Sequence, residues 1–174
     1  GKHIAATAVA KCIKNNHPGR QLIVVGVWTE IFQNLPFVDR VYQLGNTSYF
    51  YQTYVENQDS LLFANEPYFT TDHIHKKLPL VQTWAKMYGL EYRGEMPEIK
   101  FNPLQKKIAK EFWTGRANGK PIMLLQTNGG LYQEQRPYLW ARDMPVALAQ
   151  RLVDHYSDDY HIFQVKKASS EALD

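Results

Sequence analysis

Apolar and polar positions at the start of the chain follow a helical pattern. The turn residues Pro18 and Gly19 predict where this first helix ends. The next segment, 21–27, is a continuous apolar and β-branched run without polar alternation, which is typical of a strand covered on both faces in a parallel sheet. The first helix has one apolar face, formed by Ile4, Ala8, Cys12 and Ile13.

The order of helix and then strand continues as far as residue 64. The patterns predict, in chain order, a short helix at 29–34, a strand at 38–44, a helix at 48–55 and a strand at 61–64. Such alternation indicates an α/β architecture with right-handed crossovers between parallel strands.

A helical pattern that contains a proline covers residues 72–88. Pro79 predicts a kink or a new helix start, and Gly89 predicts the C-terminal stop. Residues 90–100 have no periodicity and are predicted to be a connector. Asn102 and Pro103 then predict the cap and first position of another helix. The apolar face of that helix consists of Leu104, Ile108 and Phe112.

A change of composition to Gly, Arg and Asn at 115–118 predicts a domain boundary, with one domain at 1–117 and a second at 118–174. The second part begins with a buried strand at 120–126 and a long polar loop. A helix at 145–156 and a strand at 160–165 follow. One strand–helix–strand unit is too little to close a normal domain by itself.

Composition narrows the possible functions only in part. Apolar residues make up 44% and charged residues 21% of the chain, as in ordinary soluble globular proteins. The net charge of +3 is too small to indicate a nucleic-acid partner. The single cysteine, Cys12, excludes an internal disulfide framework and a cysteine-based zinc site. No apolar stretch in the sequence has the length of a membrane span.

Two loops are candidate ligand sites, and each has a plainer interpretation. Residues 1–7 are predicted to form a strand-to-helix turn. A glycine there lets a substrate approach the backbone closely, and the unpaired N–H groups of the helix start can bind an anion. The alternative is a tight turn without a ligand. Residues 127–130 follow a buried strand, at the sheet edge where open α/β sheets bind ligands. They lack a complete phosphate-binding or dinucleotide fingerprint, so an ordinary loop is the alternative. The histidines of segment 72–75 diverge at a helix start, which favours solvated side chains over metal ligands.

In order and spacing, these pieces resemble the glycosyltransferases of the ADP-heptose:lipopolysaccharide heptosyltransferase family. That family has a strand ending in Gly-Asp, a helix with small residues and a Thr, a Pro-containing turn, a buried strand and an Asn-Pro-x-Val-Asp-Arg-Val segment. Later stretches agree as well, with Met96-Pro-Glu-Ile99 resembling "Pro-Glu-Leu" and Arg142-Asp-Met-Pro145 resembling "Lys-x-Trp-Pro". The earlier matches are Gly1, Thr7, His17-Pro18-Gly19, the strand at 22–27 and Asn34-Leu-Pro-Phe-Val-Asp-Arg-Val41.

The resemblance implies a GT-B fold, with two Rossmann-like domains across a cleft. It implies a metal-independent, inverting transfer of a heptose-like sugar from a nucleotide-sugar to a lipopolysaccharide-type or other glycan acceptor. No cofactor is implied beyond the nucleotide-sugar donor substrate. The expected location is the cytoplasm, with at most peripheral contact at the inner face of the membrane. A complete member of the family would have one more strand before Gly1 and further strand–helix units after residue 174.

The resemblance also implies roles for individual residues. Lys2 stands where the family has the Asp that acts as general base, and a Lys is protonated near neutral pH unless burial prevents it. Lys2 is instead suited to hold an acidic acceptor or a phosphate. The acceptor-binding residues are expected to be Gly1, His3 and Thr7. The donor diphosphate is expected to contact Thr127, Asn128, Gly129, Gly130 and Arg142, where Arg142 keeps the positive charge of the family's Lys.

Two other functions stay open at this point. A non-catalytic glycan-binding or scaffold relative would have kept the fold and lost the base at position 2. An unrelated α/β nucleotide-binding protein is a further alternative, which the lack of a complete fingerprint disfavours.

Overall fold

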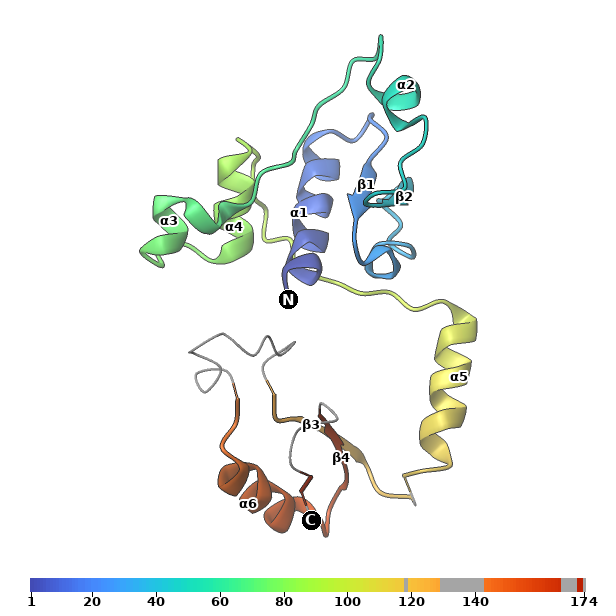
Figure 1. Cartoon of the computed structure of the whole chain (residues 1–174), viewed down its shortest axis with the longest axis vertical. Coiled ribbons are helices and arrows are strands. Elements are labelled where there is room, and N and C mark those ends of the chain that lie inside the picture. Colours follow the sequence, from blue (N-terminus) through green and yellow to red (C-terminus); the bar gives the residue numbers. More distant parts are fainter. Residues whose placement is uncertain (118, 129–142, 167–171, 174) are drawn as a thin grey trace. The chain divides into compact units, whose positions relative to one another are not determined.

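The computed structural model describes residues 1–117, 119–128, 143–166 and 172–173. The chain divides into two compact units, Gly1–Asn102 and Pro103–Asp174 (Figure 1). This division lies before the predicted boundary at residues 117 and 118. The reason is that α5 (Pro103–Thr114) belongs to the second unit, where the Trp113 ring packs edge-on against the Phe163 ring with 4.8 Å between centroids.

The first unit has most of the elements that the sequence predicts. The predicted helices at 29–34 and 48–55 are shorter than expected, and the first of them is a 3-10 helix. The elements are α1 (Lys2–Asn16), β1 (Ile23–Gly26), η1 (Thr29–Ile31), β2 (Arg40–Gln43), α2 (Phe50–Tyr54), η2 (Pro67–Phe69), α3 (Thr71–Ile74) and α4 (Leu80–Met87).

The predicted strand at 61–64 is wrong. Leu61 and Leu62 are exposed, and segment 61–64 pairs with no strand of the described chain. The segment is held by side chains instead, since the Phe63 ring lies 4.9 Å from the Tyr88 ring, centroid to centroid. A short apolar run by itself therefore does not establish a strand.

The two strands of the first unit run parallel, with Ile23 opposite Arg40 and Gly26 opposite Gln43. Their placement confirms the two predicted strands in shortened form. The prediction of cover on both faces is wrong for β1, because Val25 remains partly exposed in a sheet that has only two strands within the described residues.

Asp39 fixes the start of this sheet. Its carboxylate accepts the Leu22 N–H at 2.7 Å and the Lys14 ammonium at 3.0 Å, and so joins β1, β2 and the end of α1. The Leu22 hydrogen bond, followed by the Lys14 hydrogen bond, lowers the pKa of Asp39 below its ordinary value of 3.8.

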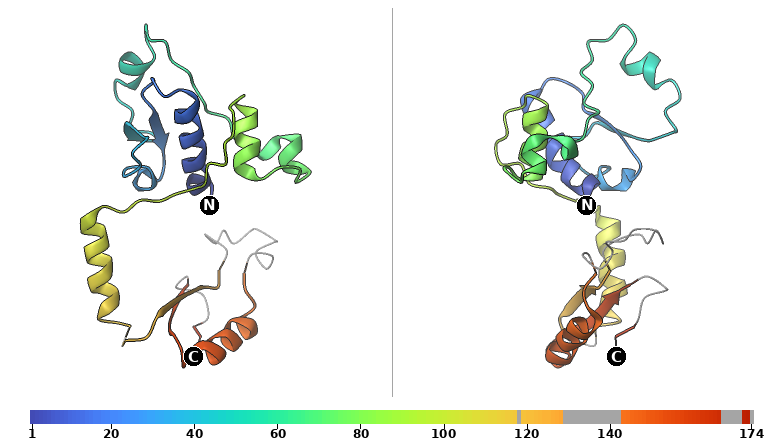
Figure 2. Two further views of the ribbon diagram at one scale, coloured as in Figure 1. Left: turned by 180° about the vertical axis from the view of Figure 1, so that it is seen from behind. Right: turned by 60° about the vertical axis from the view of Figure 1, so that its left-hand side comes forward.

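Helix α1 lies between α4 and the β1–β2 pair (Figure 1), and the view from behind in Figure 2 shows the same order. Along one side, α1 is also bonded to the predicted connector, residues 90–100, which has no regular secondary structure. The Asn16 side-chain amide donates to the Glu91 carbonyl and accepts the Glu91 N–H, both at 3.0 Å. The Asn16 side chain thus satisfies the Glu91 backbone groups, which a neighbouring strand would satisfy in a sheet.

Further along the connector, polar residues of α1 pair with acidic residues. The Lys11 ammonium lies 2.9 Å from the Glu98 carboxylate, and the Asn15 amide donates to the Glu95 carboxylate at 2.9 Å. Burial of Glu95 would raise its pKa, but hydrogen bonds from Asn15 and from the Arg93 N–H outweigh burial and lower it. The polar side of α1 is therefore an internal interface with the connector.

The predicted interruption at Pro79 is confirmed, because α3 ends before it and α4 begins directly after it. The predicted stop at Gly89 is confirmed too, and its φ of +67° lies in the left-handed region. Helix α4 turns Trp84 inward, where the indole N–H donates to the Asn65 carbonyl at 2.9 Å.

The second unit contains α5, β3 (Ile122–Gln126), α6 (Val146–Tyr156) and β4 (His161–Val165), close to the predicted ranges. Strands β3 and β4 run parallel, with Ile122 opposite His161. Within the described residues these strands form a sheet separate from β1–β2. The fold class is thus α/β, with parallel strand pairs and helices between them. None of the described helices has the length and apolar character needed to cross a membrane.

Candidate functional site

The first turn of α1 lies at the carboxyl end of β1. A Cβ atom built on Gly26 would lie 3.8 Å from two atoms of the His3 imidazole, and the Phe32 ring meets the His3 ring edge-on. Gly26 thus gives the imidazole room to lie against the strand end. Open α/β sheets bind ligands at this end, so His3 is well placed to contact one.

A carboxylate that the sequence did not indicate joins this turn. The Lys2 ammonium lies 2.6 Å from Glu66 Oε1, and both side chains are partly exposed. Glu66 directly precedes the buried Pro67 at the start of η2, which fixes the backbone beside it. We call Gly1, Lys2, His3 and Glu66 the helix-start cluster.

In the helix-start cluster, Glu66 adds a carboxylate that residues 1–3 lack. The Lys2 ammonium is only a donor, so it is not suited to take a proton from a substrate. The Glu66 carboxylate is an acceptor, and the Lys2 ammonium lies beside it. An imidazole therefore lies at the end of β1 and an ion pair at the helix start, where the carboxylate and a neutral imidazole are both groups able to accept a proton.

The structure places Thr7 away from this cluster. Its side chain is fully buried, donates to the Ile4 carbonyl at 2.7 Å and accepts the Glu98 N–H at 2.9 Å. The hydroxyl thus already donates one hydrogen bond and accepts another inside the fold. This geometry gives Thr7 a structural role and does not support contact with a glycan acceptor.

In the second unit, Thr127 and Asn128 directly follow β3. The Gln164 amide on the neighbouring strand β4 donates to the Thr127 hydroxyl at 3.2 Å, and the Gln126 amide donates to the Asn128 carbonyl at 2.9 Å. No local pattern marks Gln164 in the sequence, because only the pairing of β3 with β4 brings it to this end of the sheet.

Met144 lies at the same strand end, where its N–H donates to the Thr127 carbonyl at 2.9 Å. Thr127 therefore joins the end of β3 to the segment that leads into α6. The remaining expected donor contacts, Gly129, Gly130 and Arg142, lie outside the described residues.

In segment 72–75, Asp72 and His73 each have a side-chain partner. The Asp72 carboxylate lies 2.6 Å from the Lys86 ammonium, and the His73 ring packs edge-on against Tyr68. Across the described ranges, no group of three or more His, Cys, Asp or Glu side chains has the geometry to hold a metal ion.

Comparison with known proteins found no matching family model, no similar curated protein and no similar solved structure. The function therefore has to be inferred from the residues of the two strand ends and from the resemblance that the sequence motifs carry.

Proposed function

We propose that the protein is a glycosyltransferase that moves a heptose-like sugar from a nucleotide-sugar to a lipopolysaccharide-type or other glycan acceptor. The first unit would bind the acceptor and the second unit the donor. The observation that supports this proposal is the Lys2–Glu66 pair, which brings a carboxylate to the helix start where the resembling family has its base. On this proposal, the two α/β units are the cores of the Rossmann-like domains of a cytoplasmic GT-B enzyme.

In the proposed reaction, Glu66 takes the proton of the acceptor hydroxyl. The freed oxygen forms the new bond to the anomeric carbon, and the bond from that carbon to the nucleotide diphosphate breaks on the opposite face, which inverts the configuration. Lys2 holds the carboxylate in position through their 2.6 Å contact. His3, beside the end of β1, is placed to donate to a hydroxyl or acidic group of the acceptor.

The departing diphosphate needs donors, and the second unit offers candidates. The Asn128 amide follows β3, at the edge where a parallel sheet binds phosphates, and the buried Thr127 hydroxyl beside it is already bonded to Gln164 and Asn128. From the resemblance, Gly129 and Gly130 would add backbone N–H groups and Arg142 a guanidinium. Charge on the diphosphate is then neutralised without a metal ion.

The test is an assay of the whole chain with ADP-heptose and other nucleotide-sugars, and with truncated lipopolysaccharide cores as acceptors. Product mass and nucleotide release are measured together. Glu66→Gln is expected to lower kcat by about 10²-fold or more, as for the loss of a general base. Glu56→Gln, an exposed glutamate on another loop, is the matched control and is expected to leave turnover unchanged. Transfer that Glu66→Gln does not slow would contradict the role of Glu66 but leave the transfer function standing.

The lysine at position 2 favours a second candidate, a glycan-binding relative without catalysis. This protein would bind truncated lipopolysaccharide but release no nucleotide. Lys2→Asp separates the two functions. Activity that appears only in Lys2→Asp supports the binding protein, whereas turnover by the unmodified chain excludes it.

A further inference from the structure

Helix α5 carries an apolar stripe of three exposed side chains. Leu104, Ile108 and Phe112 recur every four residues and are 64%, 56% and 46% exposed. The helix contacts its own unit through a different side, because Trp113 packs against Phe163 on β4. The stripe, defined as Leu104, Ile108 and Phe112, is therefore available to meet another surface.

Positive charge is concentrated on the same segment. Residues 100–120 contain six of the 20 Lys and Arg residues but only one of the 17 Asp and Glu residues. This segment has a formal charge of +5, so the rest of the chain is net −2 although the whole chain is only +3. The Arg116 guanidinium lies 3.8 Å from the Phe112 ring centroid, which places one cation at the end of the stripe. Three lysines, Lys106, Lys107 and Lys110, lie on α5 itself.

We infer that α5 binds the surface of an anionic lipid bilayer, with the stripe in the headgroup region and the lysines near the lipid phosphates. Helices with apolar residues on one face and lysines on the polar face bind membranes in this way. At 12 residues, α5 is about 18 Å long, which suits lying in the surface rather than spanning the bilayer. The inference goes beyond the proposed function and does not depend on it.

Charge and polarity favour an anionic bilayer over two other partners, a second copy of the chain and a nucleic acid. A second copy of the chain would bring one +5 segment against another, and like charges repel across an apolar contact. A nucleic acid would neutralise the lysines but would leave the apolar stripe in water. An anionic bilayer satisfies both the stripe and the charge.

The test is co-sedimentation of the whole protein with vesicles, either of phosphatidylcholine alone or with about one third phosphatidylglycerol. Binding is expected only to the anionic vesicles and is expected to weaken at high salt. Lys106→Gln with Lys107→Gln should lower the partition coefficient by roughly tenfold or more, at about fivefold per lysine. The matched control, Lys76→Gln with Lys77→Gln, removes an exposed lysine pair outside α5 and should change binding less than twofold.

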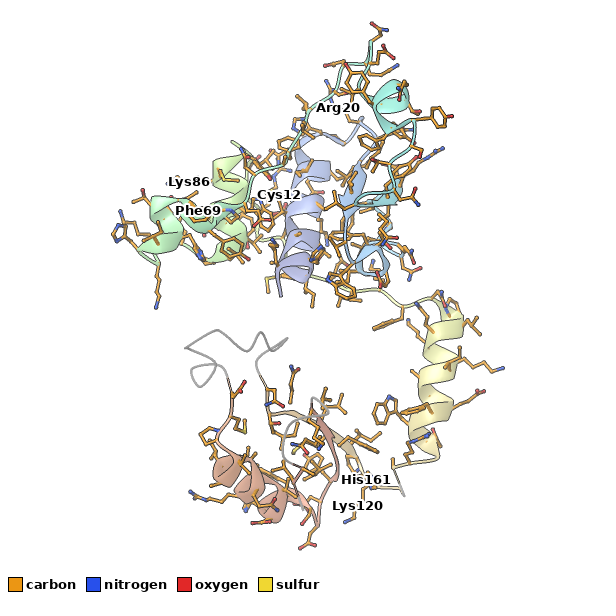
Figure 3. All side chains as sticks on the ribbon, in the orientation of Figure 1. Cys12, Arg20, Phe69, Lys86, Lys120 and His161 are labelled. Carbon is orange, nitrogen blue, oxygen red and sulfur yellow. The ribbon has the colours of Figure 1, made fainter. Side chains whose placement is uncertain are left out.

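The apolar part of the contact is tested by Leu104→Gln with Ile108→Gln, which should abolish measurable vesicle binding. The control is Phe69→Gln, at a side chain that is 92% exposed on η2 and labelled in Figure 3, and it should bind as the unmodified chain does. Circular dichroism checks that each variant is folded.

Three results would overturn the inference. The first is absent or equal binding to the two vesicle types. The second is a dimer, seen by light scattering, that the Leu104→Gln and Ile108→Gln variant abolishes, because the stripe would then bind a second copy. The third is binding to duplex DNA or RNA that competes with vesicles and is insensitive to loss of the stripe.

Discussion

The side-chain hydroxyl of Thr7 accepts the backbone N–H of Glu98 at 2.9 Å and joins α1 to the end of the connector. The hydroxyl is fully buried and also donates to the Ile4 carbonyl. Thr7→Val keeps the shape but leaves the Glu98 N–H without a partner, so unfolding free energy should fall by about 1–3 kcal/mol. Urea denaturation measures the loss, and Thr7→Ser should recover most of it.

The control for this prediction is Thr53→Val. The Thr53 hydroxyl donates to the Tyr49 carbonyl within exposed α2, so its loss should change the unfolding free energy by less than about 0.5 kcal/mol. If Thr7→Val unfolds at the same urea concentration as the unmodified chain, Thr7 does not hold the connector.

The Asp39 carboxylate should make stability depend on pH. Hydrogen bonds from the Leu22 N–H and the Lys14 ammonium lower the pKa of Asp39 in the folded chain below 3.8. A lowered pKa stabilises the fold above the ordinary value, and this stabilisation is lost as the pH falls through the folded value. The difference in urea midpoint between the unmodified chain and Asp39→Asn should therefore be constant above about pH 5 and shrink below pH 3.8.

Lys14→Met tests the two hydrogen bonds to Asp39 separately. It removes the hydrogen bond from the Lys14 ammonium and keeps the one from the Leu22 N–H. Part of the difference in urea midpoint should remain in this background and should shrink over the same acidic range. A difference that is constant down to the lowest pH would show that Asp39 titrates alike in the folded and unfolded chain.

Cys12 should be protected from thiol reagents in the folded chain. Burial, and then the charge of Glu95, raises the pKa of the Cys12 thiol to about 11, and its Sγ donates to the Glu91 carbonyl. Only the thiolate reacts, so modification by iodoacetamide near pH 8 should follow unfolding. Figure 3 labels Cys12 on α1, within the helix that the connector holds. Equal modification rates with and without urea would show that the connector opens freely.

The helices and most strands were predictable because their signals are local. Pro79 and Gly89 mark boundaries by fixing backbone angles at their own positions, and the structure has both boundaries where the sequence predicts them. The strand predicted at 61–64 failed because pairing requires a neighbour, and the residues themselves do not specify one. Local patterns therefore predicted elements, while pairing came from tertiary contacts.

The candidate site was less predictable for the same reason. His3 lies at the end of β1, as expected for a residue at a strand-to-helix turn. Glu66 reaches Lys2 from 64 residues away, and no local pattern marks that contact. Thr7 was expected to contact the acceptor because the resembling family has a Thr on this helix, but its partner Glu98 lies 91 residues further on.

Gly89 should be needed for its backbone conformation alone. The helix α4 ends in paired hydrogen bonds, from the Leu90 N–H to the Ala85 carbonyl at 2.9 Å and from the Gly89 N–H to the Lys86 carbonyl at 3.0 Å. This arrangement places Gly89 at a φ of +67°, and an added Cβ would meet no atom within 4 Å. Gly89→Ala should thus cost about 1 kcal/mol of unfolding free energy, all of it from the left-handed backbone. Gly19→Ala is the matched control, since its Cβ also meets nothing but its φ lies outside the left-handed region, so its urea midpoint should not fall. Equal losses in the two variants would show that the cost comes from the added methyl group rather than from the turn.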